Sequence, residues 1–112
     1  EKDCAPEDVS EEIVGYINRH LFEELSLEFL GKHCFMSSSQ LGRLFKKTTG
    51  SSVWEYILIK RLMAVRSLIR SGIPICKAAF DCGFHDYSAF YRAYTKKFGV
   101  SPKKDASVWI DK

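Results

Sequence analysis

An internal repeat constrains the fold of this 112-residue chain more than any other sequence feature. A shift of 49 positions brings the segment around Arg43 onto the segment around Arg92. The aligned pairs are Leu41 with Phe90, Arg43 with Arg92, Phe45 with Tyr94, Lys47 with Lys96, Gly50 with Gly99, and Ser52 with Ser101. Upstream the shift is 48, which pairs Leu27 with Ile75, Leu30 with Ala78, and Cys34 with Cys82. The chain is therefore expected to build one supersecondary unit twice, with one extra residue in the second turn.

Each copy has the pattern of a short helix, a tight turn and a second helix. Apolar residues recur at helical spacing and no window alternates with period two, so the chain is predicted to be all-α. The first copy is expected to have helices over about 27–34 and from a capping box at Ser37 and Gln40 to about Thr48. In the second copy, helices are expected over about 75–82 and between Asp86 and Gly99, with a bend at Gly83.

Three further helices complete a prediction of about seven. A supporting helix is expected from Pro6 to about Leu21, and a last helix from Pro102 to about Ile110. The longest helix, Val53 to Arg70, opens at a Ser52–Glu55 capping box and joins the two copies. At 1.5 Å per residue it would be about 27 Å long, near the roughly 34–36 Å between successive major grooves on one side of B-DNA. We predict one domain over 1–112, divided into a first helix-turn-helix unit with its supporting helix (about 8–51), a connector (52–71), and a second unit with the last helix (72–112).

Large apolar side chains and cysteines are assigned to the core. The connector is predicted to bury a stripe formed by Trp54, Leu58, Leu62, Val65 and Ile69. Further core aromatics are expected at Phe45, Phe84, Tyr94, Phe98 and Trp109, with Val108 and Ile110 as added cover. Cys34, Cys76 and Cys82 are interpreted as small buried apolar residues in a reducing cytoplasm. No Cys-x-x-Cys pair occurs, so no metal site is predicted.

Charge is distributed unevenly along the chain. Residues 1–24 carry two cations and eight anions, whereas residues 25–112 carry fifteen cations and six anions. A basic region of this kind either meets a polyanion or is simply a lysine-rich surface, and charge alone does not separate the two. No run approaches the roughly 18 apolar residues of a membrane span, so no membrane association is predicted.

The second helix of each copy has an outer face suited to a nucleic-acid groove. In the second copy, Phe90 and Tyr94 occupy the inner face of the helix, and the positions on the opposite face carry hydroxyl groups and a cation. Those positions are Tyr87, Ser88, Tyr91, Arg92 and Thr95. In the first copy, the outer positions are Ser39, Gln40, Gly42, Arg43, Lys46 and Lys47. Hydrogen-bonding groups on a helix supported by buried aromatics can read base edges in the major groove.

These motifs resemble the C-terminal DNA-binding domain of the AraC/XylS family of bacterial transcription regulators. The resemblance rests on Ala79-x3-Gly83-Phe84, on Phe90-x-Arg92-x-Tyr94, on Lys97-Phe98-Gly99-x-Ser101-Pro102, and on Leu41-x-Arg43-Leu44-Phe45-Lys46-x3-Gly50. It implies a seven-helix domain that lies in the cytoplasm behind an N-terminal sensing or dimerising region, which is absent here. It also implies RNA polymerase as a further partner, and no cofactor.

The resemblance assigns roles by position. Base contacts fall on Ser39, Gly42, Arg43, Tyr87, Ser88, Tyr91 and Arg92. Phosphate contacts are expected at Ser37, Gln40, Lys46, Lys47, Thr95, Lys96 and Lys97. Two departures from the family pattern stand out. Gly31 and Phe35 replace the usual Ala and Gly, which predicts a differently shaped first turn, with Gly31 giving room to Phe35. Asp105-Ala106 replaces the usual Tyr-Arg, which puts the packing of the last helix in question.

The sequence thus favours sequence-specific binding of double-stranded DNA by a transcription regulator that reads two successive major grooves. No enzyme activity is predicted, because the histidines lack the partners of a catalytic arrangement and no glycine-rich phosphate loop is present. The alternative is a helical protein-interaction module whose basic face meets an acidic partner.

Overall fold

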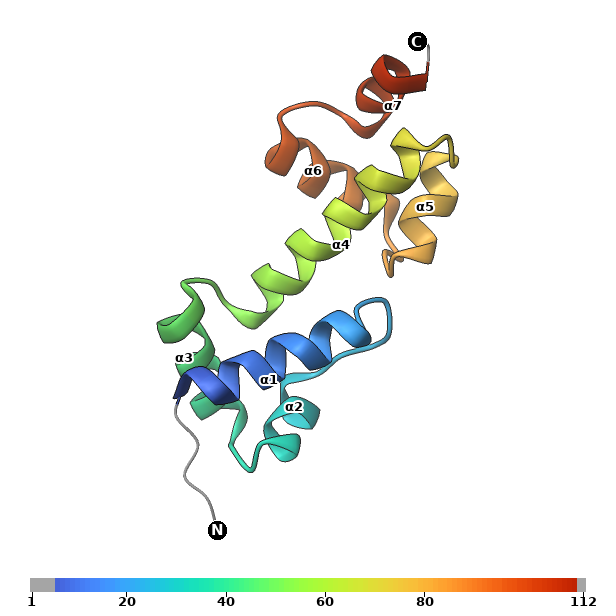
Figure 1. Ribbon diagram of the computed structural model, residues 1–112. Coiled ribbons are helices and arrows are strands. Elements are labelled where there is room, and N and C mark those ends of the chain that lie inside the picture. Colours follow the sequence, from blue (N-terminus) through green and yellow to red (C-terminus); the bar gives the residue numbers. More distant parts are fainter. Residues whose placement is uncertain (1–5, 111–112) are drawn as a thin grey trace. The chain divides into compact units, whose positions relative to one another are not determined.

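The computed structural model describes the backbone of residues 6–110 and the side chains of residues 9–107. Within that range the regular elements are seven α-helices (Figure 1), so the all-α prediction is confirmed. They are α1 (Pro6–Arg19), α2 (Leu27–His33), α3 (Ser38–Thr49), α4 (Val53–Arg70), α5 (Ile75–Asp81), α6 (Tyr87–Phe98) and α7 (Pro102–Ile110). The chain divides into two compact units, the first ending at Ile57 and the second beginning at Leu58.

Several helices begin where a polar side chain satisfies an exposed backbone N–H group, whereas α5 begins after Pro74 with no such side-chain cap. Ser37 Oγ accepts from the Gln40 N–H at 3.1 Å, and Gln40 Oε1 accepts from the Ser37 N–H at 3.1 Å, which completes the predicted capping box. Ser52 and Glu55 make the same reciprocal pair at the start of α4. In α6, Asp86 Oδ1 accepts from the Ala89 N–H at 3.2 Å. Each of these predicted starts is confirmed.

The predicted repeat is present in the backbone. The helices α2 and α5 both have 7 residues, and α3 and α6 both have 12. Each of these 12-residue helices ends at a left-handed glycine, Gly50 with φ 88° and Gly99 with φ 78°, which is the common way to close a helix. Because the helix lengths and the closing glycines agree, the two copies share one local backbone design.

The core of unit 1 gathers residues from α1, α2, α3 and the first turns of α4. Its buried members are Ile13, Ile17, Leu30, Leu41, Phe45, Val53 and Ile57. Leu41 and Phe45 stand four residues apart on α3, so one face of that helix is buried and the other is left to solvent. Removing each such large apolar side chain from water contributes on the order of 1.5–3 kcal/mol to folding.

The core of unit 2 gathers α4, α5, α6 and α7 in the same way. Its buried members are Leu62, Val65, Ile69, Ala78, Ala79, Cys82, Phe90, Tyr94 and Ala106, with Phe84 and Phe98 partly buried against them. Phe90 and Tyr94 are fully buried at four-residue spacing, so α6 is fixed along one side as α3 is.

Part of the predicted connector stripe is wrong. Trp54 and Leu58 are 48% and 38% exposed, whereas Val53 and Ile57 are buried in unit 1. Four-residue steps from Trp54 follow one face of a helix, but the first turns of α4 bury the face that carries Val53 and Ile57. Leu62 is buried in unit 2 as predicted, as are Val65 and Ile69.

The cysteine prediction is partly wrong. Cys82 is buried and Cys34 is partly buried, and both occupy the residue that ends the first helix of a copy. Cys76, however, is exposed, because the buried face of α5 carries Ala78 and Ala79 instead. The side chains of Val108, Trp109 and Ile110, which were expected to cover the core, lie outside the described side chains.

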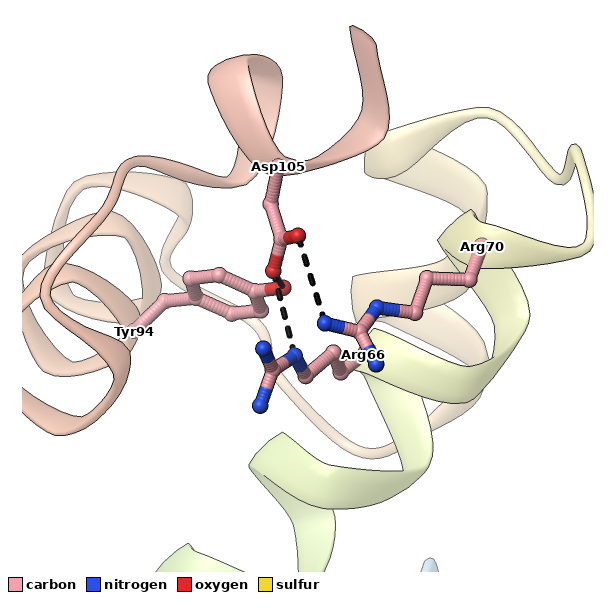
Figure 2. A network of polar contacts seen from close by, with 4 residues as sticks. All are labelled: Arg66, Arg70, Tyr94 and Asp105. Atoms are coloured by element: carbon pink, nitrogen blue, oxygen red, sulfur yellow. Dashed lines mark hydrogen bonds and ion pairs between the residues drawn. The ribbon is translucent and has the colours of Figure 1, made fainter. Parts of the chain in front are cut away.

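A buried carboxylate attaches the last helix to unit 2 (Figure 2). Asp105 of α7 is 4% exposed and accepts a hydrogen bond from the Tyr94 hydroxyl at 2.6 Å. Its oxygens lie 3.2 Å from Arg66 Nε and 3.6 Å from an Arg70 terminal nitrogen. Burial, and then the hydrogen bond to Asp105, raise the pKa of Tyr94, so its hydroxyl remains a donor. Asp105, which departs from the family pattern, therefore links α7 to α6 and α4.

Candidate nucleic-acid interface

The outer face of α6 carries the base-contact candidates of the second copy. Tyr87, Ser88, Tyr91 and Arg92 are all exposed, opposite the buried Phe90 and Tyr94. Asp86 is the helix cap, and Arg92 adds a guanidinium whose five N–H donors can match two acceptors at once. The four candidates therefore share one helix and one solvent-facing side.

The two exposed tyrosines of α6, Tyr87 and Tyr91, are held in place by contacts between aromatic rings. The Tyr87 ring lies 5.6 Å from the Phe90 ring and 6.2 Å from the Tyr91 ring, measured between centroids. Partial burial raises the pKa of Tyr87, which keeps its hydroxyl protonated. Since both rings remain partly exposed, each presents apolar carbon and a hydroxyl to a partner.

At the candidate base-contact positions, the outer face of α3 carries smaller side chains than the outer face of α6. Ser39 and Arg43 are exposed, and Gly42 is partly exposed with no heavy atom within 4 Å of where a Cβ would lie. The residue of α6 that corresponds to Gly42 is Tyr91. The first copy therefore offers fewer side-chain atoms to a groove than the second.

The phosphate-contact candidates are four exposed lysines, one threonine within α6, and two residues at the start of α3. Lys46, Lys47, Lys96 and Lys97 are exposed in the last turns of α3 and α6. Thr95 Oγ1 donates to the Tyr91 carbonyl at 2.9 Å, so its hydroxyl proton already has a partner. Ser37 and Gln40 accept each other's backbone N–H groups, but the Ser37 hydroxyl and the Gln40 amide remain available as donors.

The first turn differs from the second, as expected from the sequence: it is one residue shorter, and it leaves no room for a Cβ at Gly31, whereas Ala79 stands at the matching position of the second copy. Phe35 has φ 59° and Gly83 has φ 96°, so both turns pass through the left-handed region at the same position. The Met36 N–H donates to the Gly31 carbonyl as the Phe84 N–H donates to Ala79. A Cβ on Gly31 would lie 2.5 Å from the Met36 carbonyl oxygen, so the space beside Gly31 accommodates the turn backbone rather than the Phe35 ring.

One exposed residue shortly before α3 was not among the predicted site residues. The Phe35 ring is 95% exposed, two residues before the cap of α3. The repeat could have identified Phe35, since an aromatic residue stands there at the turn position where the second copy has Gly83.

The described part of the chain contains neither a metal-binding cluster nor a membrane-spanning helix. Among residues 9–107, no group of three or more histidine, cysteine or acidic side chains could hold a metal ion. None of the helices so described has the length and apolar character needed to cross a bilayer.

Comparison with known proteins places this geometry in a class. Residues 30–106 match the protein family described as "Helix-turn-helix domain". The probable transcriptional regulator LumQ of Photobacterium leiognathi is 34% identical over 93 residues, which is 82% of this chain and 38% of LumQ. The chain thus spans well under half the length of this relative.

Solved structures agree on the fold. An AraC-type transcriptional regulator from Chromobacterium violaceum superposes with a TM-score of 0.81 at 26% identity, over 90% of this chain and 91% of that one. The DNA-binding domain of AdpA, solved in complex with a target DNA, gives a TM-score of 0.83 at 23% identity over 91% and 93% of the chains.

The fold is thus that of an all-α domain with two helix-turn-helix units, one in each compact half. The chain belongs to the helix-turn-helix family of AraC-type transcription regulators, as the sequence motifs had predicted.

Proposed function

We propose that this domain binds double-stranded DNA in a sequence-specific manner as part of a transcription regulator. One observation carries the proposal. Arg43 and Arg92 occupy the same position of two matched 12-residue helices, and both are exposed opposite a buried apolar pair. Folding alone does not require an arginine at that position twice, whereas an arginine that pairs with guanine is the commonest base-reading contact in the major groove.

Each recognition helix would enter a major groove with its outer face toward the bases. Arg92, and likewise Arg43, would donate two hydrogen bonds to O6 and N7 of a guanine, a pairing that discriminates by about 1–3 kcal/mol. Tyr87 and Tyr91 would place ring carbons against thymine methyl groups and hydroxyls toward acceptors. Ser39 and Ser88 correspond to each other in the repeat and would donate to either kind of base edge.

The lysines would hold the duplex without reading it. Lys46 and Lys47 follow the reading positions of α3, and Lys96 and Lys97 follow those of α6. Contacts of ammonium groups with phosphate fix register and carry no direct sequence information. Ser37, Gln40 and Thr95 lie beside the same helix faces and would add hydrogen bonds to phosphate.

We also propose that the two copies read two successive major grooves. The proposal is supported by the repeat itself and by the 18 residues of α4 between the copies. We propose that residues 1–112 act together as one DNA-binding domain. In the full protein, we propose an N-terminal sensing or dimerising region, action in the cytoplasm, and RNA polymerase as a further partner. Neither catalysis nor a cofactor is part of the proposal.

The test compares Arg92→Ala with Lys97→Ala by titration against a cognate site and against random DNA. Arg92→Ala should weaken cognate binding by roughly 1–3 kcal/mol and random binding little, whereas Lys97→Ala should weaken both alike. With five or six phosphates neutralised, the log–log salt slope should be about −4 to −6. Equal losses from both substitutions on both DNAs would contradict sequence reading by Arg92 and favour a basic face that meets an acidic protein.

A further inference from the structure

Phe35 has a left-handed backbone conformation and an exposed aromatic ring, and neither feature stabilises the folded unit. Its φ of 59° is the only positive φ among the non-glycine residues of the described backbone. L-residues with a side chain are strained in that region, most of all bulky ones. The ring is 95% exposed, so no apolar burial offsets the strain.

The second copy shows what folding alone would select. Gly83 occupies the corresponding turn position with φ 96°, and its N–H donates to the Phe80 carbonyl as the Phe35 N–H donates to Lys32. Glycine adopts this conformation without steric penalty. The turn therefore requires a left-handed residue, and phenylalanine is a poor choice for it. The ring must be accounted for by something outside the folded unit.

The position of the ring indicates what that partner is. Phe35 stands two residues before Ser37, the cap of α3, and four before Ser39, a base-contact candidate. In helix-turn-helix proteins, the start of the recognition helix contacts base edges. Lys32, exposed near the end of α2, adds a cation close by in the sequence. The ring is thus presented next to the part of unit 1 that would meet the duplex.

We propose that the Phe35 ring packs against apolar DNA surface at the edge of the groove read by α3. That surface is the C–H face of a deoxyribose or the C5-methyl of a thymine, both of which accept apolar contacts. The inference rests on the proposed function and adds a contact residue that the second copy lacks. Backbone strain is then retained because the ring contributes to binding.

The test uses substitutions whose effects on folding and binding have opposite signs. Phe35→Asn and Phe35→Gly both tolerate a left-handed backbone, so the melting temperature should rise by a few degrees. Affinity for the cognate site should fall about tenfold, because the ring contact is lost. Phe35→Trp keeps an aromatic ring and should retain the affinity.

A matched control and a modified DNA sharpen the test. Phe22 is also exposed and lies between α1 and α2 beside Glu23 and Glu24, where phosphate repels the segment. Phe22→Asn should therefore leave cognate affinity unchanged. If the ring meets a methyl group, replacing thymine with uracil only in the half-site read by α3 weakens binding of the wild type but not of Phe35→Asn. If the ring meets deoxyribose, the replacement affects both proteins alike.

Each outcome decides the inference. If Phe35→Asn binds as tightly as the wild type, while Arg92→Ala still reduces preference for the cognate site, the Phe35 contact is overturned and the proposed function stands. If the wild type shows no cognate preference, the proposed function and the Phe35 contact fall together. A loss of affinity in Phe35→Asn that Phe22→Asn reproduces would also overturn the contact.

Discussion

The two units differ in the contact made by the aromatic residue at the matching position of α3 and α6. In unit 1, the Phe45 ring meets the Tyr56 ring edge-on at 5.8 Å between centroids. The corresponding residues of unit 2 are Tyr94 and Asp105, which form a buried hydrogen bond of 2.6 Å. An aromatic contact in one copy is replaced by a buried carboxylate in the other.

That replacement changes which interactions stabilise the packing of the helices in each unit. Tyr56 also donates to Asn18 Oδ1 at 3.3 Å and is only partly buried, so unit 1 has a neutral, partly exposed hydroxyl where unit 2 has a buried charge. Asp105 connects α7 to α6 and to two arginines of α4 (Figure 2). Buried ion pairs add little net stability when complete, but losing one partner leaves the others uncompensated. Unit 2 should therefore be the more fragile unit toward a single polar substitution.

Asp105→Asn should have the largest effect on folding. The amide keeps an acceptor for Tyr94 but removes the charge that faces Arg66 and Arg70. Because both arginines are about one-third exposed, the loss should be about 2–3 kcal/mol, below the full value for a buried pair. Urea unfolding measures it. The matched control is Asp81→Asn, which breaks an exposed pair with Lys77 and should change stability by less than about 0.5 kcal/mol. Similar losses in the two variants would remove the contrast between the units.

Gly31→Ala should have the next largest effect, this time in unit 1. The new Cβ would lie 2.5 Å from the Met36 carbonyl oxygen, so the turn would have to move. A loss of about 1–3 kcal/mol is expected from overpacking. Gly15→Ala is the control, since its Cβ would make an ordinary 3.4 Å contact with the Arg19 side chain. Thermal unfolding of the two variants compares them, and a stable Gly31→Ala protein would mean that the first turn is as roomy as the second, where Ala79 stands.

Tyr94→Phe should cost about 1 kcal/mol at neutral pH by removing one buried hydrogen bond. The pKa of Tyr94 is raised in the folded state, so its contribution is complete below the unfolded pKa of about 10 and declines as pH rises above that value. The difference in unfolding free energy between wild type and variant should therefore shrink above about pH 10. A difference that grows with pH would contradict the assigned hydrogen bond.

Gly42→Ala should have the smallest effect and the opposite sign. Within a helix, alanine is favoured over glycine by about 0.5–1 kcal/mol, and nothing lies within 4 Å of the new methyl group. The melting temperature should rise by a few degrees. A destabilised variant would show that the outer face of α3 is less open than the outer face of α6.

The sequence predicted the parts of the fold that local chemistry controls. Capping pairs such as Ser37 with Gln40, and the closing glycines Gly50 and Gly99, mark helix ends within a few residues. The outer faces of α3 and α6 followed from the four-residue spacing of their buried aromatic and aliphatic residues.

Features that depend on contacts distant in sequence were not predictable. Trp54 belongs to a regular apolar stripe, yet which face of α4 is buried depends on the helices packed against each turn. Asp105 looked like a loss of packing, because no local pattern shows that Arg66, Arg70 and Tyr94 converge on it. The base and phosphate roles remain proposals, since exposure makes a residue available without showing what it contacts.

The central claim is that one chain carries two copies of a groove-reading unit and uses both. Selection of bound sites from a random pool of duplex DNA tests it most directly. We expect two enriched motifs whose centres lie about one helical turn, roughly 10–10.5 base pairs, apart, with Arg43→Ala erasing one motif and Arg92→Ala the other. Enrichment of a single motif that is insensitive to Arg43→Ala, or no enrichment at all, would contradict the claim.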